Sequence, residues 1–377
     1  MKKHSWLKKL IASLLSLTML LGVMPLTVFA TDVKTLDEIN RENAAEYAIS
    51  FVDVVYENPG LESGDVISFY DENDVLSGYC VDILDDGQPN GYVVIKFLDG
   101  EQTVSEFAIE PGIENPYDQI AEDENISLED VTYYSVGPTD YQIVDTDSNA
   151  VYSFENAEST MNQFQELKQE TQLNAAISDE NEIDLNSTNG DFLSYISNSY
   201  SGAVESRGSL PGAGSVSYCY QNVIERTLNK TYGCTIVAMC NMMKYYYSRG
   251  YTNIHGDLAA LYDALWSYSL TSSGGSTFFS SAPGAIKNYL NSRGYSCSYD
   301  VYWLSLYSDF TRDISNGKPA LMCYNFNPLD GHTVFVVGFV DTTTANYLSV
   351  IDGIHSTTRY FNYDAGGVSH LGFSVQM

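Results

Sequence analysis

The chain has 377 residues and a formal net charge of −31, from 49 acidic and 18 basic side chains. This length allows two or three domains, and the lack of a basic stripe to neutralise phosphates argues against nucleic-acid binding. The charge is also uneven. Residues 31–215 hold 39 acidic and 5 basic residues, whereas residues 216–377 hold 10 and 9. This asymmetry predicts two separately built units.

Residues 1–30 have the layout of a secretory signal peptide. Four lysines in the first nine residues precede the apolar run Leu10–Phe29, and Val28-Phe29-Ala30 offers small residues of the kind that a signal peptidase reads. An uncleaved membrane anchor is the alternative, because the run is long enough to span a bilayer. Pro25 interrupts the run and favours removal. We therefore expect a secreted protein, extracellular or associated with the cell wall, with no stable membrane anchor.

The first half of the chain predicts an acidic α+β domain. Apolar residues recur at near-helical spacing over residues 36–55, which predicts a helix. The period then changes to two in four runs separated by Asp, Asn and Gly turns: Val66–Tyr70, Leu76–Leu84, Gly91–Leu98 and Thr103–Ile109. These runs predict an antiparallel meander, and residues 131–154 predict a further hairpin. The domain is placed at residues 31–160.

The next segment differs in composition. Residues 155–216 are rich in Glu, Asn, Ser and Gln and poor in aliphatic side chains. A short helix is expected near Met161–Thr171, and the remainder is expected to be mobile and accessible to proteases. We therefore interpret residues 161–215 as a linker that carries an activation cleavage.

The last 160 or so residues, 216–377, predict helices first and antiparallel strands afterwards, an α+β order. The helices are predicted at Thr235–Tyr247, Asp257–Ser269, Pro283–Arg293 and Leu304–Asn316. The strands are predicted at Ala320–Phe326, Thr333–Val340, Tyr347–Asp352 and Thr357–Tyr363. The first helix is apolar almost all round, so we expect it to be buried.

Cysteine usage does not indicate a disulfide scaffold. Only Cys80 precedes residue 216, and an odd number follow it: Cys219, Cys234, Cys240, Cys297 and Cys323. At least one thiol of the second half is therefore free unless it pairs with Cys80. No pair has the spacing of zinc ligands, so neither a metal site nor a cofactor is expected.

Cys234 is the candidate nucleophile because it opens the first predicted helix, directly after Gly233. Unpaired N–H groups and the helix dipole stabilise negative charge at such a position. They favour the reactive thiolate, whose pKa is about 8.5 in an unperturbed cysteine. Gly233 is expected to let the backbone turn sharply and to leave room for a substrate chain. The alternative is an inert core cysteine.

His332 and Asp352 favour the catalytic interpretation. His332 directly precedes a strongly apolar strand, and an imidazole there can take the thiol proton and return it to a leaving amine. Asp352 ends the next strand, so antiparallel pairing brings it towards His332, where its carboxylate would fix the imidazole. The alternatives are a solvated histidine at a strand end and an Asp-Gly turn residue.

An acyl-transfer site also needs donors for the oxyanion. The backbone N–H of Cys234 supplies one by its position, and a side-chain amide upstream is the usual second donor. Gln221 is the predicted donor of the oxyanion hole, with Asn222 as the alternative. A plain polar loop pair would explain both residues equally simply.

These motifs resemble those of papain-like bacterial cysteine peptidases, namely the streptopain-like enzymes and the double-glycine, bacteriocin-processing-type peptidases. The resemblance is carried by Gly233–Ala238, Asn316–Leu321, Gly331-His332 and Val350–Gly353, in the chain order nucleophile, histidine, acid. It spans residues 219–363 and implies a papain-like catalytic domain at residues 216–377. Family glutamines often lie about six residues before the cysteine. Gln221 lies 13 before Cys234, so a longer loop must bring it back.

The acidic half is similar to the pro-segments of streptopain-like enzymes through Gly91–Ile95. The resulting hypothesis is a secreted cysteine endopeptidase made as a zymogen, which hydrolyses peptide bonds through a Cys-His-Asp triad and a thioester acyl-enzyme. Its expected partners are a peptide or protein substrate and its own pro-domain, which would inhibit or chaperone it. The mature enzyme would begin near residues 205–218.

Three alternatives remain from the sequence. One is another acyl-transfer enzyme on the same fold, such as a transpeptidase or a peptidoglycan amide hydrolase. A second is a catalytically inactive papain-like protein that binds a partner. A third is a module without enzymatic activity in which Cys234 forms a disulfide with Cys240 or Cys219.

Overall fold

The computed structural model describes residues 35–58, 60–98, 101–137, 140–154, 196–230, 233–325, 331–365 and 370–377. The predicted signal peptide, the helix expected near Met161–Thr171 and most of the predicted linker lie outside these residues. Residues 40–377 form one compact unit, which contains all the candidate site residues. The chain is a mixed α+β protein with a large, mostly antiparallel sheet, which confirms the predicted fold class at this level.

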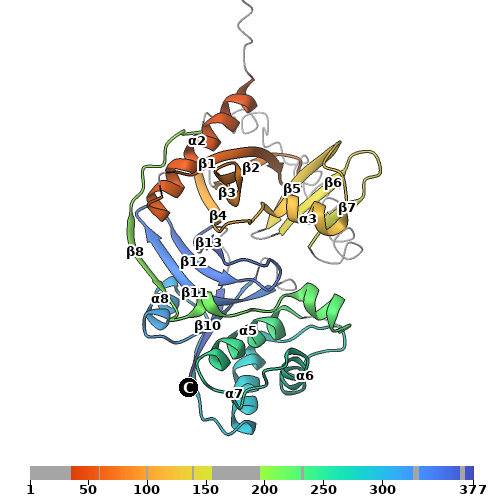
Figure 1. Ribbon diagram of the computed structural model, residues 1–377, viewed down its shortest axis with the longest axis vertical. Helices are drawn as coiled ribbons and strands as arrows, with labels where there is room; N and C mark the ends of the chain where they lie inside the picture. The colour runs from red at the N-terminus through yellow and green to blue at the C-terminus, as the bar shows by residue number, and fades with distance from the viewer. Residues whose placement is uncertain are drawn as a thin grey trace, which may run out of the picture. The chain divides into compact units, whose positions relative to one another are not determined.

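The first part of the unit is a helix on a meander (Figure 1). Helix α2 (Leu36–Tyr56) buries a stripe that includes Ala44, Ala48, Phe51 and Val55, at the three- and four-residue spacing of one helix face. Four strands pair antiparallel in chain order: β1 (Glu62–Tyr70), β2 (Leu76–Asp85), β3 (Gln88–Leu98) and β4 (Glu101–Ala108). Helix α3 (Pro116–Glu124) and the short strands β5 (Val131–Gly137), β6 (Asp140–Asp145) and β7 (Val151–Ser153) follow.

The second part begins with helices that pack on one another and on a group of strands (Figure 1). They are α5 (Cys234–Ser248), α6 (Leu258–Tyr268), α7 (Ala282–Ser292) and α8 (Tyr307–Ser315). The strands are β9 (Ser298–Tyr302), β10 (Ala320–Asn325), β11 (Gly331–Thr342), β12 (Asn346–Ile351), β13 (Arg359–Asn362) and β14 (His370–Gln376). As expected from its composition, α5 is buried on nearly every face.

One sheet runs through both parts. Its strand order is β7-β6-β5-β1-β2-β3-β4-β13-β12-β11-β10-β14-β9. The two parts join where β13 pairs antiparallel with β4, through Tyr360 opposite Phe107 and Phe361 opposite Glu106. A shared apolar cluster also contains Tyr347 of β12 beside residues of α2 and β4. The change of charge near residue 216 therefore does not mark a break in the sheet, and one apolar cluster contains residues from both sides of it.

The end of the predicted linker is held by hydrogen bonds. The Tyr200 N–H donates to Ser50 Oγ of α2 over 2.7 Å. Strand β8 (Val204–Ser209) then pairs antiparallel with the end of β11. The expectation of a mobile segment is therefore wrong for residues 196–209. Their side chains are mostly polar and exposed, and composition does not reveal that their backbone completes a sheet.

Among the described residues, no helix combines the length and the apolar character that crossing a membrane requires.

Candidate active site

Cys234 is the first residue of α5, as the sequence predicts. Gly233 is the N-cap residue, and no side chain caps the first turn. The N–H groups of that turn are therefore available to stabilise negative charge near the sulfur. The expectation that Gly233 serves a sharp backbone turn is wrong, because its φ of −145° is open to any residue. A side chain is excluded instead by the neighbouring loop, since a Cβ there would lie 2.2 Å from the carbonyl oxygen of Gly275.

The environment of the Cys234 thiol favours its ionised form. Burial raises the pKa of Cys234, but a hydrogen bond and the charge of His332 lower it, as do the N–H and hydroxyl of Thr333. The net direction is downward. Burial instead raises the pKa of four other cysteines: Cys80, Cys240, Cys297 and Cys323. Cys234 is also half-buried rather than enclosed. The direction of the pKa shift thus distinguishes Cys234 from these four cysteines, and exposure distinguishes it from all of them except Cys297.

His332 lies near the start of β11 and contacts both Cys234 and the turn after β12. Its Nε2 is 2.7 Å from the main-chain carbonyl oxygen of Asp352. A carbonyl oxygen only accepts hydrogen bonds, so Nε2 carries the proton. The other ring nitrogen, Nδ1, is then the one able to accept the proton of the Cys234 thiol. His332 is therefore held in the tautomer that a general base requires.

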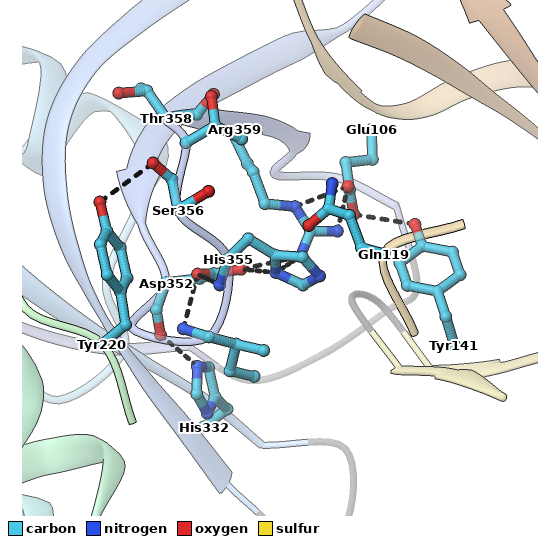
Figure 2. A network of polar contacts seen from close by, with 12 residues as sticks. Glu106, Gln119, Tyr141, Tyr220, His332, Asp352, His355, Ser356, Thr358 and Arg359 are labelled. Atoms are coloured by element: carbon cyan, nitrogen blue, oxygen red, sulfur yellow. Dashed lines mark hydrogen bonds and ion pairs between the residues drawn. The ribbon is translucent and has the colours of Figure 1, made fainter. Parts of the chain in front are cut away.

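Asp352 reaches His332 by its main chain and not by its carboxylate (Figure 2). Carboxylate Oδ1 accepts the N–H groups of Ile354 and His355, each over 2.9 Å. Oδ2 accepts from Nδ1 of His355 over 2.5 Å and from Nη1 of Arg359 over 2.7 Å. The expected contact between carboxylate and imidazole is thus not formed. The reason is local. An Asp-Gly sequence favours a turn in which the aspartate side chain accepts backbone N–H groups, and the buried Arg359 needs the other carboxylate oxygen, Oδ2, as its ion-pair partner.

A second acidic residue binds the same arginine. The Nε of Arg359 donates to Oε1 of Glu106, which lies in β4, over 2.7 Å, and Nη2 of Arg359 also contacts this carboxylate. The hydroxyl groups of Tyr92 and Tyr141 donate to Glu106 over 2.5 and 2.9 Å. All of these side chains are buried. Burial has the largest single effect and raises the pKa of Asp352, but the charges and hydrogen bonds of His355 and Arg359 together lower it well below its ordinary value, so it stays ionised.

His355 is buried beside these charged side chains. Its ring is fully buried and meets the ring of Phe154 edge-on, with centroids 4.1 Å apart. Burial lowers the pKa of His355, and the positive charge of Arg359 lowers it further. The ring is therefore neutral near pH 7, and its Nδ1 contacts both Oδ2 of Asp352 and Nη1 of Arg359. We call Glu106, Asp352, His355 and Arg359 the buried charge cluster.

Gln221 is brought back to the site in spite of its distance along the chain. Its N–H donates to the carbonyl oxygen of Gly353 over 2.7 Å. Asn241 of α5 fixes the preceding turn, since its side-chain amide accepts the N–H of Cys219 over 2.8 Å and donates to the Cys219 carbonyl over 3.0 Å. Gln221 is buried whereas Asn222 is exposed. Of the two candidates for the oxyanion hole, Gln221 therefore has the more enclosed position.

Gln221 Oε1 is buried without a hydrogen-bond partner among the described residues. A buried amide oxygen of this kind is costly unless it is satisfied. The Gln221 side chain thus lies beside the turn that also holds His332, and its Oε1 can still accept a hydrogen bond.

All six cysteines lie within the described residues, and none of them forms a disulfide. Cys240 forms its contact with Cys219 and not with Cys234. Among the described residues, no three His, Cys, Asp or Glu side chains are grouped so as to hold a metal ion. The sulfur of Cys234 is therefore available for chemistry in this structure.

The sequence predicts Cys234, His332 and Gln221 as site residues, but it does not predict the buried residues around them. Thr333, His355, Arg359 and Glu106 were not singled out. Arg359 and Glu106 are charged residues buried within strands, in β13 and β4. Such a charge is almost always paired when buried. The partner could not be identified, since 253 positions separate the two residues.

No protein-family model matches this chain, and no curated protein matches it either. The functional assignment therefore depends on the residues and geometry described above.

Proposed function

We propose that this protein is a papain-like cysteine endopeptidase, secreted and made as a zymogen, with Cys234 as nucleophile and His332 as general base. One observation carries the proposal: His332 is hydrogen-bonded to a thiol of lowered pKa at a helix N-terminus, and a main-chain carbonyl fixes its tautomer. Thiolate and imidazolium formed by one proton transfer are the reactive pair of such enzymes.

The chemistry proceeds in two halves. The Cys234 thiolate attacks the peptide carbonyl carbon, a C–S bond forms and the carbonyl oxygen becomes an oxyanion. In this proposal the N–H of Cys234 and the side-chain amide N–H of Gln221 donate hydrogen bonds to that oxyanion. His332 then donates its proton to the leaving amine as the C–N bond breaks, which leaves a thioester. Water attacks the thioester, His332 takes its proton, and the acid is released with the thiolate regenerated.

The acidic residues 31–160 act as the pro-domain in this proposal, and the linker carries the activation cleavage. The hydrogen bonds of β8 bear on the position of that cut. Because β8 pairs with β11, a cut before Val204 leaves the sheet of the catalytic part intact. A cut further along, nearer residue 218, would remove an edge strand.

The test uses the full chain and two cysteine variants. The wild type is expected to mature and to hydrolyse casein, whereas Cys234→Ala should do neither. Cys323→Ala is the matched control, because Cys323 is a neighbouring thiol whose pKa burial raises to about 12. It should retain activity. Parallel assays on muropeptides separate the peptidase from an enzyme that acts on peptidoglycan. Maturation and casein hydrolysis by the Cys234→Ala protein would contradict the proposal.

A further inference from the structure

The two parts of the chain meet at the buried charge cluster (Figure 2). Arg359 belongs to β13, and its guanidinium lies between two carboxylates from opposite sides. Nε and Nη2 face Glu106 of β4, while Nη1 faces Asp352 after β12. The planar fork of arginine suits this arrangement, because it can bind two carboxylates in fixed directions. The acidic N-terminal part thus supplies one of the two carboxylates that hold Arg359.

The other carboxylate belongs to the residue that holds the general base. Asp352 binds Arg359 through Oδ2, and it binds His332 through its own carbonyl oxygen, 2.7 Å from Nε2. Oδ1 of the same carboxylate closes the turn by accepting two backbone N–H groups. Rotation of this side chain would therefore open the turn and move the carbonyl. A continuous path of contacts joins Glu106 to the imidazole of His332.

We propose that Arg359 and Glu106 are positioning residues for His332, so that the acidic N-terminal part helps to order the active site in the uncut chain. This inference rests on the proposed function, since it assumes that Cys234 and His332 are the reactive pair. It deepens that function by assigning the pro-domain an assembling role at the site itself.

Loss of Glu106 is expected to raise the pKa of Cys234 in two ways, both through His332. The Arg359 guanidinium loses the carboxylate that binds its Nε and Nη2. The turn at Asp352, and with it the Asp352 carbonyl that binds His332, is then held less firmly. A negative charge near the site is also lost, which disfavours the imidazolium. Both effects weaken the support that His332 gives to the thiolate, and the pKa of Cys234 rises.

Other contacts between the same two parts offer matched controls, because they do not touch Arg359. Thr357 Oγ1 donates to Glu110 Oε2 over 3.0 Å, only two residues from Arg359 in the chain. Arg226 pairs with Asp123 over 3.4 Å at the exposed surface. A general loosening of the two parts would follow from loss of these contacts as well, whereas the proposed positioning would not.

The experiment measures iodoacetamide alkylation of Cys234 against pH in the full chain, with peptide mass spectrometry to identify the labelled thiol. The variants are Glu106→Gln, which removes charge, and Arg359→Lys, which keeps charge but removes the fork. Both are expected to raise the apparent pKa of Cys234 and to slow its alkylation at pH 7 about tenfold. Glu110→Gln and Asp123→Asn should stay within about twofold of the wild type.

Tyr92→Phe is the milder variant in case Glu106→Gln does not fold, since it removes one hydrogen bond to Glu106 and leaves its charge. A smaller shift in the same direction is expected. The positioning role is overturned if the alkylation profile is unchanged both in Arg359→Lys and in the Glu106 or Tyr92 variant. In that case, selective labelling of Cys234 in the wild type would still support the proposed peptidase function. Equal labelling of all six cysteines in the wild type overturns both.

Discussion

At the scale of single residues, the base of this site is held by a peptide carbonyl and not by an acid side chain. His332 depends on the Asp352 carbonyl for its tautomer, and the Asp352 carboxylate serves the turn and Arg359. The acid of the expected triad is therefore at the predicted position but bonded to other partners. The sequence allowed the prediction that Asp352 comes near His332, because strand pairing determines it. It could not reveal the side-chain direction, which depends on a buried arginine.

The lowered pKa of Cys234 predicts a thiolate that depends on His332. With His332 in place, alkylation by iodoacetamide should be fast at pH 6–7, below the ordinary range of a cysteine pKa, about 8.5. In His332→Ala the pKa of Cys234 should rise, so that the rate at pH 7 falls at least about tenfold and recovers only near pH 9. Pseudo-first-order labelling rates across pH measure this directly. His255→Ala, which alters a histidine bonded to Tyr289, is the control. A His332→Ala profile that matches the wild type would contradict the predicted dependence.

Asp352→Asn separates the two roles that an acid can have here. An asparagine can still cap the turn, but it leaves Arg359 with one charged partner instead of two. We expect a loss of about 3–5 kcal/mol in the free energy of unfolding, as for other broken buried ion pairs, together with slower Cys234 alkylation. Urea unfolding and labelling on the same samples measure both. Lost reactivity with unchanged stability would instead indicate a direct bond from carboxylate to imidazole.

At the scale of elements, the start of α5 is fixed by close packing. The loop that contains Gly275 crosses directly over Gly233, where a Cβ would lie 2.2 Å from a carbonyl oxygen. Sequence patterns predicted where α5 begins and that it is buried, because Gly-Cys before an apolar run is a local signal. The covering loop was not predictable, since nothing in residues 270–277 indicates which helix they contact.

Gly233→Ala should therefore destabilise the protein and disturb the site. The backbone oxygen of Gly275 cannot move alone, so the loop must shift, at a cost of about 1–3 kcal/mol typical of overpacking. Gly284→Ala is the matched control. It lies within α7 with open space around the added methyl group and should stabilise by about 0.5–1 kcal/mol. Thermal unfolding of the two variants should shift in opposite directions. Equal melting temperatures in Gly233→Ala and Gly284→Ala would show that the loop at Gly275 moves aside without a cost in stability.

At the scale of the whole molecule, the sequence does not predict that one sheet joins the two parts. The hairpins β1–β4 were predictable because short turns rich in Asp, Asn and Gly join their strands, and β11–β12 because only three residues, 343–345, join two apolar strands. The pairing of β4 with β13 was not, because no local signal relates Phe107 to Tyr360. In the structure these two rings stack with centroids 4.7 Å apart. Strands β9 and β14 were also missed, and β9 is too polar and exposed to show a pattern.

The buried charge cluster predicts how stability depends on pH. His355 is neutral in the folded protein because its pKa is lowered below 6.5, so the unfolded chain binds the extra proton first. The free energy of unfolding should therefore fall as pH decreases through about 6.5. Asp352, also of lowered pKa, keeps its contribution to far lower pH. Urea midpoints between pH 8 and 5 measure the slope. His355→Asn should flatten it, and an unchanged slope in that variant would assign the effect to other groups.

The pairing of β4 with β13 also has a consequence for folding. Strands β1–β4 are local in the chain and can form early, but the neighbour of β4 arrives about 250 residues later. Until then β4 is a bare edge, which in most proteins invites aggregation with other copies. The strong negative charge of residues 31–215 opposes that encounter, because early intermediates repel one another. The negative charge of the first half would thus reduce aggregation at the exposed edge of β4 until β13 is synthesised and pairs with it.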